Sequence, residues 1–170
     1  RGIVEAPDTA LGALPLLSPE ERQTLLVDWN RTAVEGPGEA TVHTLFEEQA
    51  RRTPEAIALI HEDLRLSYRE LDERSNRLAR YLQKLGVGPE IRVGLSLLRS
   101  PDLHVAILGV WKAGGAYVPL DPAYPEDRLS FMVADSRIAL LLSEERVLDE
   151  LPAPEVPVVA LDSSAEAIGA

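Results

Sequence analysis

The chain has 170 residues, of which 45% are hydrophobic and 26% are charged, as in an ordinary globular domain. Its net charge of −11 excludes the usual nucleic-acid and anionic-membrane surfaces, because both need clustered Lys and Arg. Cysteine is absent, which excludes disulfides, thiol nucleophiles and cysteine-ligated zinc. We find neither an apolar run long enough to cross a bilayer nor a signal-peptide core, and we expect the polypeptide to continue beyond both ends.

Residues 1–40 read as a linker that carries one helix. Turn signals at Ala6-Pro7-Asp8, Gly12 and Gly36-Pro37-Gly38 surround that helix. Ser18-Pro19-Glu20-Glu21 supplies an N-cap, a proline at the first helical position and a glutamate at the third. Its apolar side chains, Leu25, Leu26 and Trp29, share one face, so we expect the helix to dock on a larger body. A plain linker with a fraying helix remains the alternative.

The main domain begins with a helix over Thr41 to Arg52, which Pro54 ends. The apolar strand 57–60, a turn at Glu62-Asp63 and a returning strand over Leu64 to Ser67 predict a β-hairpin. Ser67 and Glu70 then form a capping box for the next helix. The face of that helix expected to be buried consists of Leu71, Ser75, Leu78, Leu82 and Leu85, and Gly86 suits the left-handed residue that follows.

From residue 91 onward, strands and helices alternate. Strands are predicted at 91–97, 117–120, 138–142 and 158–161. Helices are predicted to start at the cap Ser100-Pro101-Asp102, with Asp102 in the first turn, and to span 126–135 and 144–151, the last capped by Ser143. The buried side of the first of these helices is expected to be Leu103, Ala106, Ile107, Val110 and Trp111. This alternation is typical of an α/β fold with a mostly parallel sheet flanked by helices.

Candidate chemical groups in this region have simpler structural explanations. Gly114-Gly115 follows a helix and precedes a strand, the reverse of a phosphate-binding loop, so we interpret it as a helix stop. Lys112 could bind an anion, but a cation in the last helical turn is also favoured by the helix dipole. Asp121 follows a strand, where α/β sheets place ligands, yet Asp-Pro is also turn chemistry, and we favour the turn.

The three histidines, His43, His61 and His104, show no spacing that suggests a metal pair or a catalytic triad. No nucleophile-elbow pattern is present. The residues alone therefore predict an incomplete α/β domain without a visible catalytic constellation.

Three segments resemble the start of the adenylation domain of nonribosomal peptide synthetases, within the AMP-forming acyl and aminoacyl ligase superfamily. Residues 66–71 (LSYREL) resemble its first core motif, residues 112–121 (KAGGAYVPLD) its second, and residues 124–129 (YPEDRL) the continuation. Residues 14–32 resemble the segment that joins a condensation domain to the adenylation domain. The resemblance divides the chain into a condensation-to-adenylation linker, 1–40, and the first part of the large N-terminal subdomain, 41–170, truncated before the phosphate loop.

The resemblance implies that the intact domain activates an amino acid with ATP and Mg²⁺, forms an aminoacyl-adenylate and releases pyrophosphate. It implies transfer of the acyl group to a phosphopantetheine thiol on a peptidyl carrier domain, with a condensation domain in the same cytoplasmic polypeptide. The family's phosphate loop, amino-acid pocket, adenine motifs and catalytic lysine have no matching positions here. We therefore expect no catalytic, cofactor-binding, substrate-binding or metal-binding residue in these 170, and no activity from them alone.

Two alternatives stay open. One is an acyl-CoA or aryl-acid ligase of the same superfamily, against which the linker and the loop at 117–129 argue. The other is a purely structural docking segment of an assembly line, which residues 1–40 motivate.

Overall fold

The structure is a computed structural model that describes residues 7–8, 10, 17–34, 36, 38–149, 151 and 156–169. The chain divides into two compact units, residues 1–40 and residues 41–170. The predicted turn at Gly12 and most of the predicted loop 152–157 lie outside the described residues. In the described part of the chain, no helix is both long and apolar enough to cross a membrane.

The first unit contains the helix predicted after Ser18. α2 (Pro19–Gln23) continues into a π-helical turn, η2 (Thr24–Asp28). The predicted capping box is confirmed: the Glu21 amide donates to Ser18 Oγ at 3.1 Å, and the Ser18 amide donates to Glu21 Oε2 at 2.8 Å. Within this unit Leu26 and Trp29 are exposed, at 57% and 70%.

The second unit begins with α3 (Val42–Arg52), whose N-cap Thr41 accepts a hydrogen bond from the Thr44 amide. The predicted hairpin follows as β1 (Ile57–His61) and β2 (Leu64–Ser67), paired antiparallel. α4 (Tyr68–Lys84) then starts at the predicted Ser67–Glu70 capping box and ends before Gly86, which has φ +89°. Each of these local predictions rested on short-range chemistry, and each is confirmed.

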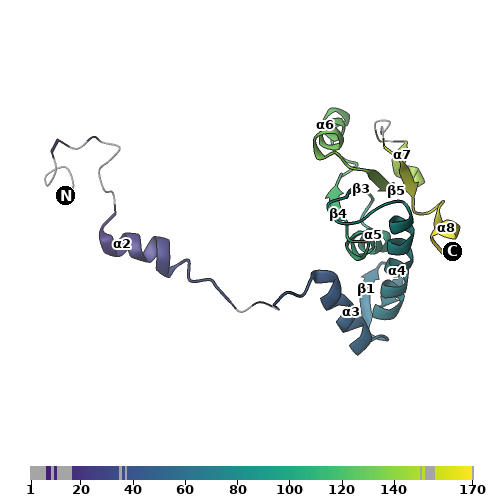
Figure 1. Cartoon of the computed structure of the whole chain (residues 1–170), viewed down its shortest axis with the longest axis horizontal. Coiled ribbons are helices and arrows are strands. Elements are labelled where there is room, and N and C mark those ends of the chain that lie inside the picture. The colour runs from purple at the N-terminus through teal and green to yellow at the C-terminus, as the bar shows by residue number, and fades with distance from the viewer. Residues whose placement is uncertain are drawn as a thin grey trace. The chain divides into compact units, whose positions relative to one another are not determined.

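The main sheet has four parallel strands, and Figure 1 shows the helices around it. The strands are β3 (Arg92–Ser96), β4 (Ala116–Pro119), β5 (Leu140–Ser143) and β6 (Val158–Ala160), in the spatial order β4-β3-β5-β6. The helices that alternate with them are α5 (Pro101–Lys112), α6 (Glu126–Ser136), α7 (Glu145–Leu148) and α8 (Ala165–Gly169). The predicted parallel α/β architecture is therefore confirmed.

Alternation along the strands gives the sheet two apolar faces. On one face Val93, Leu95 and Leu142 pack with residues of α4 and α5 in the main core. On the other face Leu141 and Leu120 pack against Leu129 of α6. A sheet covered on both faces explains why the strands read as continuous apolar runs rather than as alternating patterns.

Helix α5 is buried more widely than the sequence predicted, because it packs against both α4 and the sheet. Val105, Leu108 and Gly109 are buried in addition to the expected Ala106 and Val110. The contact with α4 is close: a Cβ on Gly109 would lie 2.9 Å from Leu78 Cδ2. A glycine at this helix position thus lets the two helices approach.

The predicted start of α5 is confirmed, with Ser100 at the N-cap and Asp102 in the first turn, although the Ser100 hydroxyl accepts no capping hydrogen bond. Two local predictions were wrong. Leu85 is 49% exposed, since it caps α4 instead of lying on its buried face. Ser143 belongs to β5, while the N-cap of the short helix α7 is Glu144, and Asp162 accepts a hydrogen bond from the Glu145 amide at 3.2 Å.

Candidate functional site

The carboxyl edge of the parallel sheet is the part of this fold where a ligand would be expected. From β3 the chain crosses through α5 to β4 on one side, and from β5 it crosses through α7 to β6 on the other side. Connections that diverge in this way leave a crevice between the two strands at their carboxyl ends, the usual ligand position in open α/β sheets. The residues at the ends of β3 and β5 therefore form the candidate site.

Two serines lie opposite each other at this edge. Ser96 and Ser143 are paired in register, and both are fully buried. The Ser143 hydroxyl donates to the Ser96 carbonyl oxygen at 2.9 Å. The Ser96 hydroxyl itself has no partner within the described residues. A buried hydroxyl without a partner costs about 1–3 kcal/mol, so this one needs a water molecule or another polar group.

The loops that follow the two strands add two more unpaired oxygen atoms. Ser100, at the start of α5, has a buried hydroxyl that meets no partner in the described part of the chain. Glu144 is 6% exposed, and its Oε2 accepts a hydrogen bond from Arg146 Nε at 2.7 Å. Its second oxygen, Oε1, is buried without a described partner. The edge thus offers hydrogen-bonding groups, but it shows no nucleophile joined to a base, which covalent catalysis would require.

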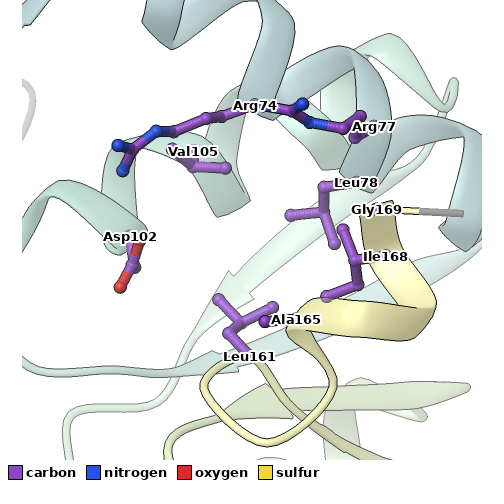
Figure 2. Close-up of a pocket in the computed structure, with 9 residues that line it drawn as sticks. All are labelled: Arg74, Arg77, Leu78, Asp102, Val105, Leu161, Ala165, Ile168 and Gly169. Atoms are coloured by element: carbon purple, nitrogen blue, oxygen red, sulfur yellow. The ribbon is translucent and has the colours of Figure 1, made fainter.

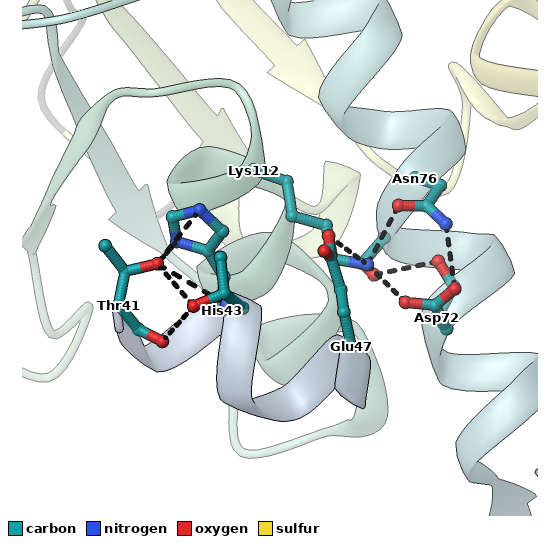
Figure 3. Close-up of polar contacts among 8 residues, drawn as sticks. Thr41, His43, Glu47, Asp72, Asn76 and Lys112 are labelled. Carbon is teal, nitrogen blue, oxygen red and sulfur yellow. Dashed lines mark hydrogen bonds and ion pairs between the residues drawn. The ribbon is translucent and has the colours of Figure 1, made fainter. Parts of the chain in front are cut away.

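A second polar cluster surrounds Lys112 at the end of α5, as Figure 3 shows. The Lys112 ammonium donates to Asp72 Oδ1 at 2.6 Å and to Asn76 Oδ1 at 2.8 Å, and it lies 3.8 Å from Glu47 Oε1. Only 4% of the lysine side chain is exposed, and its Nζ lies 5.4 Å from the centre of the Phe46 ring. These contacts join α3, α4 and α5.

The Lys112 cluster serves to hold helices together, because the lysine's donors are directed at protein groups. The prediction that this lysine lies in the last turn of its helix is confirmed. Its carboxylate partners were missed. Asp72 and Asn76 are one helical turn apart and hydrogen-bonded to each other at 2.9 Å, so their own pairing could have been predicted from the sequence. Their contact with Lys112 could not, because it joins residues 36–40 positions apart.

The remaining candidates also have structural roles. Gly114 has φ +89°, and a Cβ on Gly115 would lie 2.8 Å from Val87 Cγ1, as expected for a helix stop followed by close packing. Asp121 Oδ1 accepts a hydrogen bond from the Ala123 amide at 3.0 Å, which confirms the turn interpretation. Within the described ranges, no group of three or more His, Asp or Glu side chains could hold a metal ion.

Comparison with known proteins identifies the family. A model of the family described as AMP-binding enzyme matches residues 46–168. Tyrocidine synthase 3 of Brevibacillus parabrevis is 46% identical over 166 residues, which is 96% of this chain but only 2% of that protein. The chain thus spans a small part of the curated relatives it matches.

Solved structures of related enzymes also match most of this chain. A nonribosomal peptide synthetase, FmoA3, in a form bound to α-methyl-L-serine-AMP, has a TM-score of 0.75 and 31% identity over 84% of this chain and 16% of its own. The N-terminal subdomain of Klebsiella oxytoca NpsA, in complex with 3-hydroxyanthranilyl-AMSN, has a TM-score of 0.68 and 26% identity over 74% of this chain and 32% of its own. The chain therefore belongs to the AMP-binding enzyme family, and its structural relatives include nonribosomal peptide synthetases.

Proposed function

We propose that this chain is part of an adenylation domain that activates an amino acid for nonribosomal peptide synthesis. In that reaction the amino-acid carboxylate attacks the α-phosphorus of Mg²⁺-bound ATP, pyrophosphate leaves, and an aminoacyl-adenylate forms. A phosphopantetheine thiol on a carrier domain then takes the acyl group and AMP leaves. The observation that carries the proposal is the AMP-binding family match over residues 46–168, together with 46% identity to a tyrocidine synthase.

The proposed contribution of these residues is structural. The two motifs that resemble the adenylation family lie at a helix N-cap, Ser67–Glu70, and at a helix stop, Gly114-Gly115. The polar side chains of both motifs are engaged in structural contacts: Glu70 caps α4, Lys112 is paired with Asp72, and Asp121 accepts from the Ala123 amide. We therefore assign the phosphate loop, the amino-acid pocket and the catalytic lysine to polypeptide outside these 170 residues, and we assign no residue of this chain to catalysis or to ligand binding in that reaction.

Residues 1–40 are proposed to be the linker between a condensation domain and the adenylation domain, in a cytoplasmic synthetase that also carries a peptidyl carrier domain. Support comes from the resemblance of residues 14–32 to that linker and from the exposed Leu26 and Trp29 within this unit. Pull-down of a condensation domain should be lost when residues 1–40 are deleted. Binding that survives the deletion would refute the linker assignment.

The activity is tested by amino-acid-dependent exchange of labelled pyrophosphate into ATP, measured on the synthetase that contains this chain. One amino acid should stimulate exchange well above the background, and the stimulation should require Mg²⁺. Exchange that responds to no amino acid would contradict the proposal.

A second candidate is activation of an aryl acid, favoured by the likeness to NpsA, whose structure contains a 3-hydroxyanthranilyl compound. The lower identity of that match, 26% against 31% for FmoA3, makes it the less favoured one. The same exchange assay separates the two candidates, because 3-hydroxyanthranilate or a fatty acid would then replace the amino acid as the stimulating substrate.

A further inference from the structure

A cavity of about 320 Å³ opens at the carboxyl edge of the sheet, on the face covered by α4 and α5. Leu161 follows the last residue of β6, and Asp102 lies in the first turn of α5, which follows β3. The cavity is thus next to the position where parallel α/β sheets bind ligands. Its volume is at the small end of the range of small-molecule sites. Its lining includes Arg74, Arg77, Leu78, Asp102, Leu161 and Ile168.

The walls of this cavity are mostly apolar. Figure 2 shows Leu78 and Ile168 beside each other, with Leu161 and Ala165 on the side formed by the α8 segment. Leu78 is 1% exposed and belongs to the main core, to which Leu161 and Ile168 are attached. An apolar ligand group entering the cavity would therefore lie against the buried Leu78 and the half-buried Leu161 and Ile168.

The charge around the cavity is mainly positive, although the chain as a whole carries a net charge of −11. Arg74 and Arg77 extend from α4 along the side opposite Leu161 and Ala165 (Figure 2). Neither arginine has an ion pair within the described residues, whereas Arg69 of the same helix pairs with Glu55. The N-terminus of the 12-residue helix α5 adds its dipole at this point.

One acidic group opposes this field. Asp102 lines the cavity and offsets part of the helix dipole, but within the described residues it forms no ion pair with either arginine. Arg74, whose charge also acts on Glu70, and Arg77 form no ion pair within the described residues, and beside the apolar wall they provide the two elements that an apolar carboxylate needs. Guanidinium groups bind carboxylates through two parallel hydrogen bonds, and the wall can take up the hydrocarbon part.

We propose that this cavity binds a small carboxylic acid with an apolar chain, its carboxylate held by Arg74 and Arg77 and its hydrocarbon lying against Leu78, Leu161 and Ile168. This proposal goes beyond the adenylation activity proposed above and does not depend on it. An apolar amine should be rejected, because it would bring a third positive charge next to the two arginines.

Titration of the 170-residue chain with octanoate, followed by backbone amide NMR, tests the proposal. Octanoate should shift the signals of Ile168 and Leu78 saturably. It should bind at least tenfold more tightly than octylamine, which lacks the negative charge, and than acetate, which lacks the apolar chain. Equal binding of octylamine, equal binding of acetate, or the absence of a saturable shift with octanoate would each overturn the proposal.

Substitutions locate the site. Arg77→Gln and Arg74→Gln should each weaken octanoate binding by about tenfold, corresponding to about 1.4 kcal/mol. Arg80→Gln is the matched control: it removes the same charge from the exposed surface of α4, outside the cavity lining, and should leave the affinity unchanged. Equal losses in all three variants would show that only general charge matters and would refute the site. Self-association abolished by Arg77→Gln would assign the cavity to a second copy of the chain instead.

Discussion

The Ser67–Glu70 capping box is the clearest case of one side chain setting the start of an element. The Ser67 amide donates to Glu70 Oε2 at 2.8 Å, and the Ser67 hydroxyl donates to the same oxygen at 2.9 Å. These two hydrogen bonds, together with the positive charge of Arg74, hold the pKa of Glu70 below its ordinary value. The ionised glutamate is thus the form that the folded chain prefers.

The pH dependence follows from this direction. Because the folded pKa is lowered, the stabilisation is present above the pKa of the unfolded chain and is lost as the pH falls through the folded value. Glu70→Gln should therefore reduce the loss of unfolding free energy between neutral and acidic pH, as measured by urea denaturation. Glu48→Gln, at an exposed position on α3, is the control and should change this pH dependence little. An unchanged acid response in Glu70→Gln would contradict the lowered pKa.

Lys112 makes a second prediction at the scale of the residue. Lys112→Met removes the cation between Asp72, Asn76 and Glu47 and leaves polar groups unpaired beneath α3. We expect the unfolding free energy to fall by about 3 kcal/mol, as for a broken buried pair, or somewhat less because 27% of the Asp72 side chain is exposed. Lys84→Met, in the last turn of α4, should cost less than about 0.5 kcal/mol in the same denaturation experiment. Similar losses for both lysines would show that the cluster adds nothing specific.

At the scale of the element, the contact between α4 and α5 depends on Gly109. Gly109→Ala gains helix propensity, but its methyl group would lie 2.9 Å from Leu78 Cδ2 in a fully packed core. We expect a net loss of about 1–3 kcal/mol in unfolding free energy, as for other overpacked cores. Gly88→Ala is the control, since nothing lies within 4 Å of its new methyl group. A Gly109→Ala variant as stable as the parent would show that the packing cost does not exceed the gain in helix propensity, about 1 kcal/mol.

The elements themselves were largely predictable because their signals are local. Capping boxes at Ser18 and Ser67 and the helix stop at Gly114-Gly115 each need only a few neighbouring residues, and each is confirmed. One error came where the sheet decides. Ser143 follows an apolar run and precedes two glutamates, so it reads as an N-cap, yet pairing with β3 extends β5 through it.

The candidate site could not be predicted for the same reason. Ser96 and Glu144 carry no distinguishing pattern in the sequence, and only the order of the strands brings their loops to one edge. The partners of Lys112 likewise lie on helices whose approach is fixed by tertiary packing. Local sequence patterns predict whether a segment is a helix or a strand, whereas contacts between side chains far apart in the sequence depend on the topology of the fold.

At the scale of the whole molecule, the proposed function predicts that the 170-residue chain is inactive alone. Purified chain with ATP, Mg²⁺ and each amino acid should show no pyrophosphate exchange above a protein-free blank, because the described residues hold a framework without a nucleotide-binding loop. The synthetase that contains the chain is the positive control. Robust turnover by the 170 residues would overturn the assignment of the catalytic groups to polypeptide outside them.

The two edge strands of the main sheet, β4 and β6, differ in their ability to pair with a further strand. In β4 the amides of Ala116 and Leu120 point toward β3, donating to Ile91 and Leu95, so the amide positions of Tyr117 and Pro119 point outward. Proline has no amide hydrogen, and the outer border of β4 therefore offers a single donor.

The other border is a better template. In β6 the Leu161 amide donates to Ser143 of β5, so the amides of Val158 and Ala160 point outward, and β6 itself carries no charge that would repel a partner. At high protein concentration, hydrogen exchange should slow at Val158 and Ala160 while Tyr117 stays unchanged; slowing at Tyr117 instead would contradict this. Strands from other chains should therefore add at the β6 edge of the sheet. At the β4 edge, Pro119 lacks the amide hydrogen that such pairing needs.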